Sequence, residues 1–336
     1  SCTTALHLSL AALDFKPGDE AIVPAFTWIS TANVVEHLGG KVVFCDIDLE
    51  TFNIDANQLE EKITPKTKAI IPVHLFGLSA DMDPIMKIAK KYNLIVVEDA
   101  ACGFGSRYKN KHVGTIGDTG AFSFHPRKAI TTGEGGMITT DNSELAEKIR
   151  SMRDHGAMMS DYQRHHGSKP YLLSEHPYAG YNYRMTDIQG SLGSAQMERA
   201  EEIILERVEL AKRYKQYLSD LDFFQLPIDN ENFFNGYQSF PCLFNNKEIE
   251  MDNINKINEE RNVFMNSLQD KGVSTRPATH AVHMLKYYID KYEIQPSDFP
   301  KAYIANECSI SFPLFNGLKL EEQDFVIKNI LECLGV

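Results

Sequence analysis

The sequence predicts an α/β protein with a large three-layer αβα domain, built on a mostly parallel sheet, and a smaller C-terminal α/β domain. Through about residue 150, short β-branched runs alternate with helical patterns, which is typical of a parallel sheet covered by helices on both faces. After that region, one long helical pattern leads into a second, shorter set of strands and helices. A chain of 336 residues has room for both domains.

The first domain is expected to span residues 1–190. Its strands are runs of apolar and β-branched residues, and its helices are amphipathic stretches between those runs. The expected strands are residues 21–23, 41–44, 69–73, 94–97, 121–123 and 137–139, and the expected helices are residues 31–38, 57–62 and 84–92.

The second domain is expected to span residues 191–336. Residues 187–217 are rich in Ala, Glu, Arg, Leu and Lys and predict one extended helix that joins the two domains. Further strands are expected at residues 239–244 and 309–312, and further helices at residues 253–271 and 321–334. Residues 156–180, rich in His, Tyr, Ser and Pro, predict a long loop.

Composition excludes several classes of protein. The net charge of -12 and the pI near 5.4 argue against non-specific binding to nucleic acid, which requires a basic surface. No apolar stretch is long enough to predict a membrane span, and no basic leader opens the chain. Six scattered cysteines without a C-x-x-C pair predict a reduced cytoplasmic protein without a metal site.

Two adjacent carboxylates are the first candidates for chemistry. Residues 95–97 are apolar and are followed at once by Glu98 and Asp99, so both side chains belong at the carboxyl end of a parallel strand. Open α/β sheets bind their ligands at that edge, and one carboxylate of the pair is expected to face the pocket. Taken alone, the motif favours a helix cap or a surface ion pair.

Lys128 is the second candidate. It follows the strand at residues 121–123 and an aromatic-proline turn, and it precedes the glycine-rich residues 133–136. A desolvated lysine beside another cation, here Arg127, is expected to have a lowered pKa and to be a better nucleophile for a Schiff base. The glycines themselves predict a tight turn between strands.

Two other glycine-based interpretations fail. Residues 133–136 lack the spacing of a phosphate-binding loop, and residues 114–120 lack the G-x-G-x-x-G pattern that opens a helix in dinucleotide-binding proteins. A kinase or a nicotinamide dehydrogenase therefore gains no support.

Seven ordered motifs together resemble the pyridoxal-5'-phosphate (PLP) dependent nucleotide-sugar aminotransferase family, the DegT/StrS type, whose members have the fold-type I aminotransferase architecture. The resemblance covers nearly the whole chain. The motifs are residues 1–6, 24–28, 72–77, 98–101, 123–128, 131–136 and 180–185.

The resemblance implies PLP as the cofactor and a role for each residue that matches the family's motifs. Lys128 would hold PLP as an imine and later carry a proton, and Asp99 would pair with the ring nitrogen. Backbone amides around Thr3 and Thr4, at the start of a helix, would bind the phosphate, with a further contact from Ser123.

The other implied contacts surround the ring and the substrate. Trp28 would stack on the PLP ring, and Asn182 would reach the cofactor of the neighbouring subunit, which implies a homodimer with shared active sites. Cys102 stands where the family commonly has a polar side chain facing the phenolic oxygen, and a thiol is a weaker partner. The residues implied to line the substrate cleft are His74, His280 and His283.

The function implied is transamination: an amino acid, glutamate, gives its amino group to a nucleotide-linked keto-deoxysugar, as part of polysaccharide biosynthesis. One alternative is a pyridoxamine-dependent sugar dehydratase, but Lys128 argues against it because those enzymes carry His at that position. A non-catalytic or regulatory homologue and a plain nucleotide-binding enzyme are the remaining alternatives.

Overall fold

A six-stranded sheet forms the centre of the large part of the molecule. The computed structural model describes residues 1–159, 166, 171–244 and 249–336. Strand order is β3-β1-β4-β5-β8-β9, and every neighbouring pair is parallel except β8 with β9. The strands are β1 (Glu20–Pro24), β3 (Lys41–Cys45), β4 (Thr67–Ile70), β5 (Ile95–Asp99), β8 (Thr119–Ser123) and β9 (Gly136–Thr139). The predicted α/β class with a mostly parallel sheet is confirmed.

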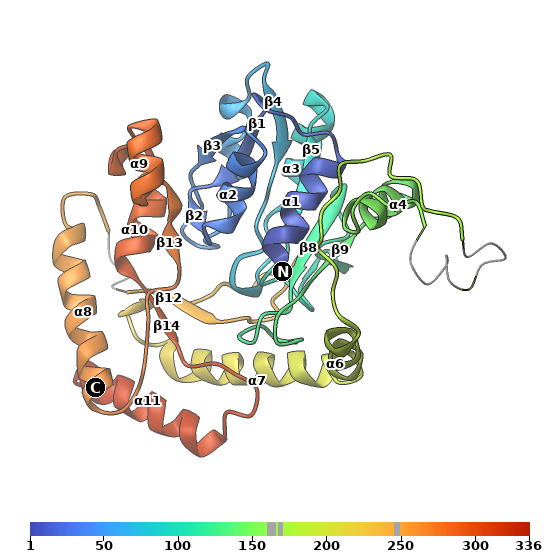
Figure 1. Ribbon diagram of the computed structural model, residues 1–336. Helices are drawn as coiled ribbons and strands as arrows, with labels where there is room; N and C mark the ends of the chain where they lie inside the picture. The colour runs from blue at the N-terminus through green and yellow to red at the C-terminus, as the bar shows by residue number, and fades with distance from the viewer. Residues whose placement is uncertain (160–165, 167–170, 245–248) are drawn as a thin grey trace.

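Helices cover both faces of this sheet, because neighbouring residues of a strand point to opposite sides. Val23 of β1 packs in one apolar cluster with Leu6 and Leu10 of α1, whereas its neighbour Ile22 packs in another with Ile85 of α3. Figure 1 shows the resulting three layers. The covering helices are α1 (Cys2–Ala12), α2 (Ser30–His37), α3 (Met82–Tyr92) and α4 (Ser143–Met152).

The C-terminal part contains a small antiparallel sheet of order β10-β12-β14 with helices around it. Its strands are β10 (Phe224–Gln225), β12 (Phe240–Phe244) and β14 (Ser309–Phe312). Its helices are α7 (Ala200–Leu218), α8 (Ile254–Asp270), α9 (Lys286–Tyr292), α10 (Pro300–Cys308) and α11 (Leu320–Leu334).

Short elements connect these parts. They are β2 (Phe26–Thr27), β6 (Arg107–Tyr108), β7 (Lys111–His112), β11 (Phe233–Phe234) and β13 (His280–Ala281), and the 3-10 helices η1 (Ala56–Gln58), η2 (Glu60–Lys62), η3 (Leu75–Gly77), η4 (Val282–Met284) and η5 (Pro296–Asp298). The helix predicted at residues 57–62 is therefore wrong, since two separate single turns occupy that stretch.

The single helix predicted at residues 187–217 is also wrong. The chain forms α6 (Asp187–Met197) and α7, and Arg199 between them leaves the helical region at φ -109° and ψ 9°. α7 buries one face in the core, whereas α6 buries no residue, and the break lets the two helices run in different directions (Figure 1). Of the predicted loop, residues 160–165 and 167–170 lie outside the described residues, and residues 156–159 and 171–180 contain no helix or strand.

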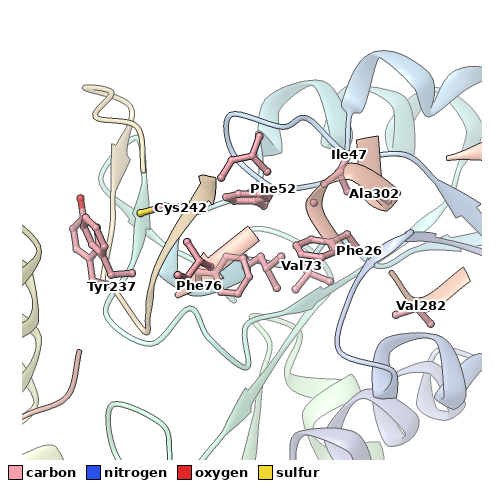
Figure 2. Packing of buried hydrophobic residues seen from close by; sticks show 14 of the residues in the cluster. Phe26, Ile47, Phe52, Val73, Phe76, Tyr237, Cys242, Val282 and Ala302 are labelled. Atoms are coloured by element: carbon pink, nitrogen blue, oxygen red, sulfur yellow. The ribbon is translucent and has the colours of Figure 1, made fainter. Parts of the chain in front are cut away.

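One apolar cluster crosses the boundary predicted between residues 190 and 191. Phe26 and Phe76 from the first part share it with Cys242, Val282 and Ala302 from the second, as Figure 2 shows. In addition, β2 pairs with β13, and β6 pairs with β11. The boundary stays a prediction, and the two parts share a continuous core.

Candidate active site

Asp99 is the last residue of β5, and its carboxylate is nearly buried, with 4% of its surface exposed. The Thr31 hydroxyl donates a hydrogen bond to Asp99 Oδ2 at 2.8 Å, and the Ala101 amide donates to Oδ1 at 3.1 Å. The Cys2 thiol lies 3.8 Å from Oδ1. These contacts fix the carboxylate and bring the start of α1 to the carboxyl edge of the sheet.

Glu98 precedes Asp99 and points to the opposite side of the strand. Its fully buried carboxylate accepts hydrogen bonds from His74 Nε2 at 2.9 Å and from the amides of Gly114, Ile116 and Gly117 at 2.6 to 2.7 Å. Burial alone would raise the pKa of Glu98, but His74 and the amides hold it below its usual range. Glu98 therefore organises the loop beside β5.

Lys128 lies in the turn after β8, where its amide donates to the carbonyl of His125 at 2.9 Å. Its Nζ donates to Cys102 Sγ at 3.1 Å, and Cys102 lies three residues beyond Asp99. Since β5 and β8 are adjacent and parallel, Lys128 and Asp99 lie at the same edge of the sheet, close enough for the Asp99 carboxylate to act on the charge of the Lys128 amine.

The pKa of the Lys128 amine is raised, whereas the sequence led us to expect a lowered pKa. Burial by itself lowers the pKa of the Lys128 amine, but the Cys102 thiol and the Asp99 carboxylate more than offset it, so the pKa lies above its usual value. The expectation that Arg127 lowers this pKa is wrong, because Arg127 is exposed and is not among the groups that shift it.

The N-terminus of α1 lies beside Asp99, since the Cys2 thiol contacts the Asp99 carboxylate. The Ser1 hydroxyl caps the helix by accepting from the Thr4 amide at 3.2 Å, while the Thr3 hydroxyl donates to Ser30 Oγ at 2.9 Å. The first amides of a helix have no partner within it, so those of Cys2 and Thr3 can serve an anion. Ser123 ends β8 opposite Gly136 of β9.

Gly136 permits the close approach of β9 to this helix end. A Cβ atom at this position would lie 2.5 Å from the backbone carbon of Ser1 and 2.8 Å from the amide nitrogen of Cys2. Any side chain would push the helix end away from the sheet, so the glycine preserves the position of the first amides of α1 beside β9.

Trp28 and His280 form an exposed wall. They come together because β2 pairs with β13, with Thr27 opposite His280. Their rings lie 5.6 Å apart in an edge-on arrangement, and 56% of the Trp28 surface is exposed. Both side chains are accessible to a ligand, as a ring-stacking residue and a substrate contact must be.

His74 and His283 do not line a cleft, contrary to expectation. Both side chains are fully buried. Besides its bond to Glu98, His74 accepts from the Ala80 amide through Nδ1 at 3.2 Å, so both ring nitrogens are occupied within the protein. His283 packs between the rings of Phe44 and Phe299. The sequence could not show which side of the chain these rings occupy.

Asn182 is exposed and lies in a bridge with Asp154, ahead of α6. The contact expected between Asn182 and the cofactor of a second subunit stays a prediction. No group of three or more His, Cys, Asp or Glu side chains in the described part of the chain is arranged to hold a metal ion. Within the same residues, no helix is long and apolar enough to cross a membrane.

The donor set suits PLP: an amine for the aldehyde, a fixed carboxylate for the ring nitrogen, and helix amides for the phosphate. On a three-layer α/β fold, this arrangement defines a fold-type I PLP-dependent enzyme. The chain belongs to the DegT/DnrJ/EryC1/StrS aminotransferase family, whose model matches residues 1–331.

Three relatives illustrate the similarity. GDP-perosamine synthase of Escherichia coli O157:H7 is 37% identical over 98% of this chain and 83% of its own length. Spore coat polysaccharide biosynthesis protein SpsC of Bacillus subtilis is 36% identical over 99% of this chain and 84% of its own. The structure of Spr1654 from Streptococcus pneumoniae in its PMP form matches with a TM-score of 0.89 and 29% identity, over 99% of this chain and 86% of that chain.

Spr1654 has also been solved in a PLP form. The cofactor of this family, and of this chain, is PLP.

Thr31 is a contact that sequence analysis missed. It is fully buried in the first turn of α2 and holds Asp99, yet in the sequence it is one threonine among several near a helix start. Its position three residues after Trp28 was the only available signal.

Proposed function

We propose that this PLP-dependent aminotransferase moves an amino group from glutamate to a nucleotide-linked keto-deoxysugar. The observation that carries the proposal is that the Lys128 amine and the Asp99 carboxylate lie at the carboxyl ends of the adjacent strands β8 and β5, close enough to interact electrostatically. The substrate class is supported by the E. coli relative, whose name gives a GDP-linked product.

Each residue has a defined task in this proposal. When bound, PLP supplies an aldehyde that combines with amines and a ring that withdraws electrons from the neighbouring carbon. Lys128 Nζ holds the cofactor and afterwards moves a proton to and from the carbon that bears the amino group. Asp99 accepts the hydrogen bond of the ring nitrogen, and Thr31 keeps Asp99 in place.

The remaining tasks are binding and orientation. The amides at the start of α1 and the Ser123 hydroxyl hold the phosphate. Trp28 covers one face of the ring, and His280 beside it contacts the sugar substrate. Cys102 Sγ, which accepts a hydrogen bond from the Lys128 amine, lies beside the group that holds the cofactor.

The test uses purified protein loaded with PLP. Adding glutamate is expected to shift the absorption of the bound cofactor from its imine to its amine form, and a nucleotide-linked keto-deoxysugar should reverse the shift. A panel of such sugars with different nucleotides then identifies the acceptor. Bound PLP that responds to no amino donor would favour the regulatory alternative.

Reduction with borohydride gives an independent check of the anchor. Peptide mapping should place the label on Lys128, and the Lys128→Ala variant should carry none. Lys111→Ala, which changes an exposed lysine in β7, serves as the control and should label normally. A label on another lysine would overturn the assignment.

We further propose that the enzyme is a cytoplasmic homodimer in which Asn182 reaches the neighbouring cofactor. Ile188 and Leu192 lie one helical turn apart on α6 and are 84% and 43% exposed, which suits a subunit contact close to Asn182. Sedimentation is expected to show a dimer that Ile188→Asp weakens, whereas Val263→Asp on the exposed side of α8 leaves it intact. All six cysteines are free, which supports a reducing compartment.

A further inference from the structure

A single side chain from the C-terminal part holds both peptide groups that flank Lys128. Gln238 Oε1 accepts a hydrogen bond from the Ala129 amide at 3.0 Å, and Gln238 Nε2 donates one to the Arg127 carbonyl at 2.7 Å. We propose that Gln238 is a positioning residue for Lys128, setting the direction from which its amine enters the pocket; this inference rests on the proposed function.

The two hydrogen bonds from Gln238 fix the orientation of the Lys128 backbone as well as its position. An amide group is planar, so two hydrogen bonds from its opposite ends fix both the distance and the rotation of the peptides they join. Lys128 lies between those two peptides, and its own amide is tied to His125. Its Cα atom is thus restrained from three sides.

The turn that carries Lys128 borders open space next to Gln238. A cavity of about 530 Å³ borders it, lined among others by Lys128, Gln238, Arg276 and Asn316. Ala129 and Ile130 pack in the core on the far side, so the Gln238 amide restrains the turn on the side that faces the cavity. Without it, the turn can move toward the cavity and carry the amine of Lys128 with it.

The backbone of Gln238 is itself fixed by hydrogen bonds from a buried arginine. Arg207 of α7 is 4% exposed, and its Nη1 donates to the carbonyls of Tyr237 and Gln238, each at 3.2 Å. Arg207 Nε donates to Asn316 Oδ1 at 2.7 Å. A buried guanidinium bound to uncharged oxygens is costly, and here it fixes the backbone at residue 238.

The backbone of Tyr237 and Gln238 also packs closely against Gly77 in the large part of the molecule. A Cβ atom on Gly77 would lie 2.6 Å from the Tyr237 amide nitrogen and 2.8 Å from that of Gln238. Tyr237 has a positive φ of 44°, a strained conformation for a residue with a side chain. Such strain persists where the surroundings impose it, and it turns the next residue toward Lys128.

The decisive variant is Gln238→Met, which keeps the length of the side chain but removes both hydrogen bonds. A displacement of about 1 Å at a reacting group can cost about 10²-fold in rate, so kcat with glutamate is expected to fall about 10- to 100-fold. The pH at which the absorption of bound PLP changes should also move, since that pH reports the surroundings of the Lys128 nitrogen. Gln238→Glu keeps an oxygen that accepts from the Ala129 amide, so its kcat should lie between that of Gln238→Met and that of the wild type.

Gln225→Met is the matched control. Gln225 is also half-buried and donates to a backbone carbonyl, that of Leu49 at 2.8 Å, but it makes no contact with the Lys128 turn. It should change Tm about as much as Gln238→Met while leaving kcat and the spectral titration unchanged. If both variants lower kcat equally and neither moves the titration, Gln238 only stabilises the fold.

A second measurement starts from the wild-type protein, so its first result does not depend on how the variants fold. In the wild-type protein the Ala129 amide is expected to resist hydrogen exchange, and loss of one hydrogen bond in Gln238→Met should speed it about 10-fold. Exchange of the wild-type Ala129 amide at the rate of an open loop would overturn the inference. A wild-type enzyme whose bound PLP ignores every amino donor would instead overturn the proposed function, leaving the exchange result to decide the role of Gln238.

Discussion

Two carboxylates stand side by side at the end of β5, and the structure surrounds them differently. Glu98 receives four hydrogen bonds from the protein, from one imidazole and three amides. Asp99 receives one from a hydroxyl, one from an amide and a long one from the Cys2 thiol, and its carboxylate acts on the charge of the nearby Lys128 amine. Both are buried, so burial alone does not distinguish them. The difference lies in whether the protein has already filled their capacity to accept hydrogen bonds.

Asp99→Asn should produce the largest effect on activity. The variant keeps the shape of the side chain but removes the negative charge that would face the ring nitrogen, so activity with glutamate is expected to fall about 10³-fold. Steady-state kinetics measure this loss, and thermal unfolding should show little change. An Asp99→Asn enzyme within about tenfold of wild type would contradict the distinction drawn between the two carboxylates.

Glu98→Gln should lower the stability of the fold and leave activity largely unchanged. An amide at this position cannot accept from His74 and the three backbone amides as a carboxylate does, and the free energy of unfolding at pH 7 is expected to drop by about 3 kcal/mol. The folded protein should keep most of its activity. Urea unfolding followed by assays of the folded variant would check both statements.

The pH dependence of that stability has a definite sign. Because the pKa of Glu98 is lowered in the folded protein, its stabilisation is fully present above the pKa of an unfolded glutamate, about 4.3, and is lost as pH falls through the folded value. The gap in stability between wild type and Glu98→Gln should therefore narrow in acid. A gap that stays constant down to about pH 3 would show that Glu98 is not the responsible charge.

Cys102→Ala should give the smallest of these effects, on the rate at which PLP binds. Cys102 lies three residues beyond Asp99 and contacts the Lys128 amine. The thiol helps to raise the pKa of Lys128, and only the uncharged amine can attack the aldehyde of PLP. Uptake of PLP by the cofactor-free wild-type protein should become faster as pH rises. Cys102→Ala should take up PLP several-fold faster at pH 7, and stopped-flow absorbance would measure this. Identical pH profiles for both proteins would contradict it.

The strands, and the positions of Asp99 and Lys128 at the ends of two of them, could be predicted from local sequence. The strand predicted at residues 309–312 coincides with β14, and the motifs around Asp99 and Lys128 lie at the ends of neighbouring parallel strands as expected. Such motifs work because a buried apolar run ends where its polar residues begin, and parallel strands end at the same edge of a sheet.

Other features depended on packing between distant segments. The rings of His74 and His283 turned inward, and no local pattern distinguishes an inward ring from an outward one. Gln238 contacts a turn about 110 positions earlier in the chain, through an ordinary side chain in an unremarkable segment. Helix α4 was also missed, although Asn142 caps it through the Leu145 amide at 3.1 Å, a signal present in the sequence.

The pairing of β2 with β13 has a consequence for how the enzyme is made. It joins segments 252 residues apart, as the bond from the Thr279 hydroxyl to the Thr27 carbonyl shows. Segments so distant meet late, since a long loop must close first. A chain emerging from the ribosome can form the central sheet well before His280 is synthesised. Lys128 and Asp99 can then lie at the edge of that sheet before Gln238, which contacts the Lys128 turn, and His280, which packs beside Trp28, have been made.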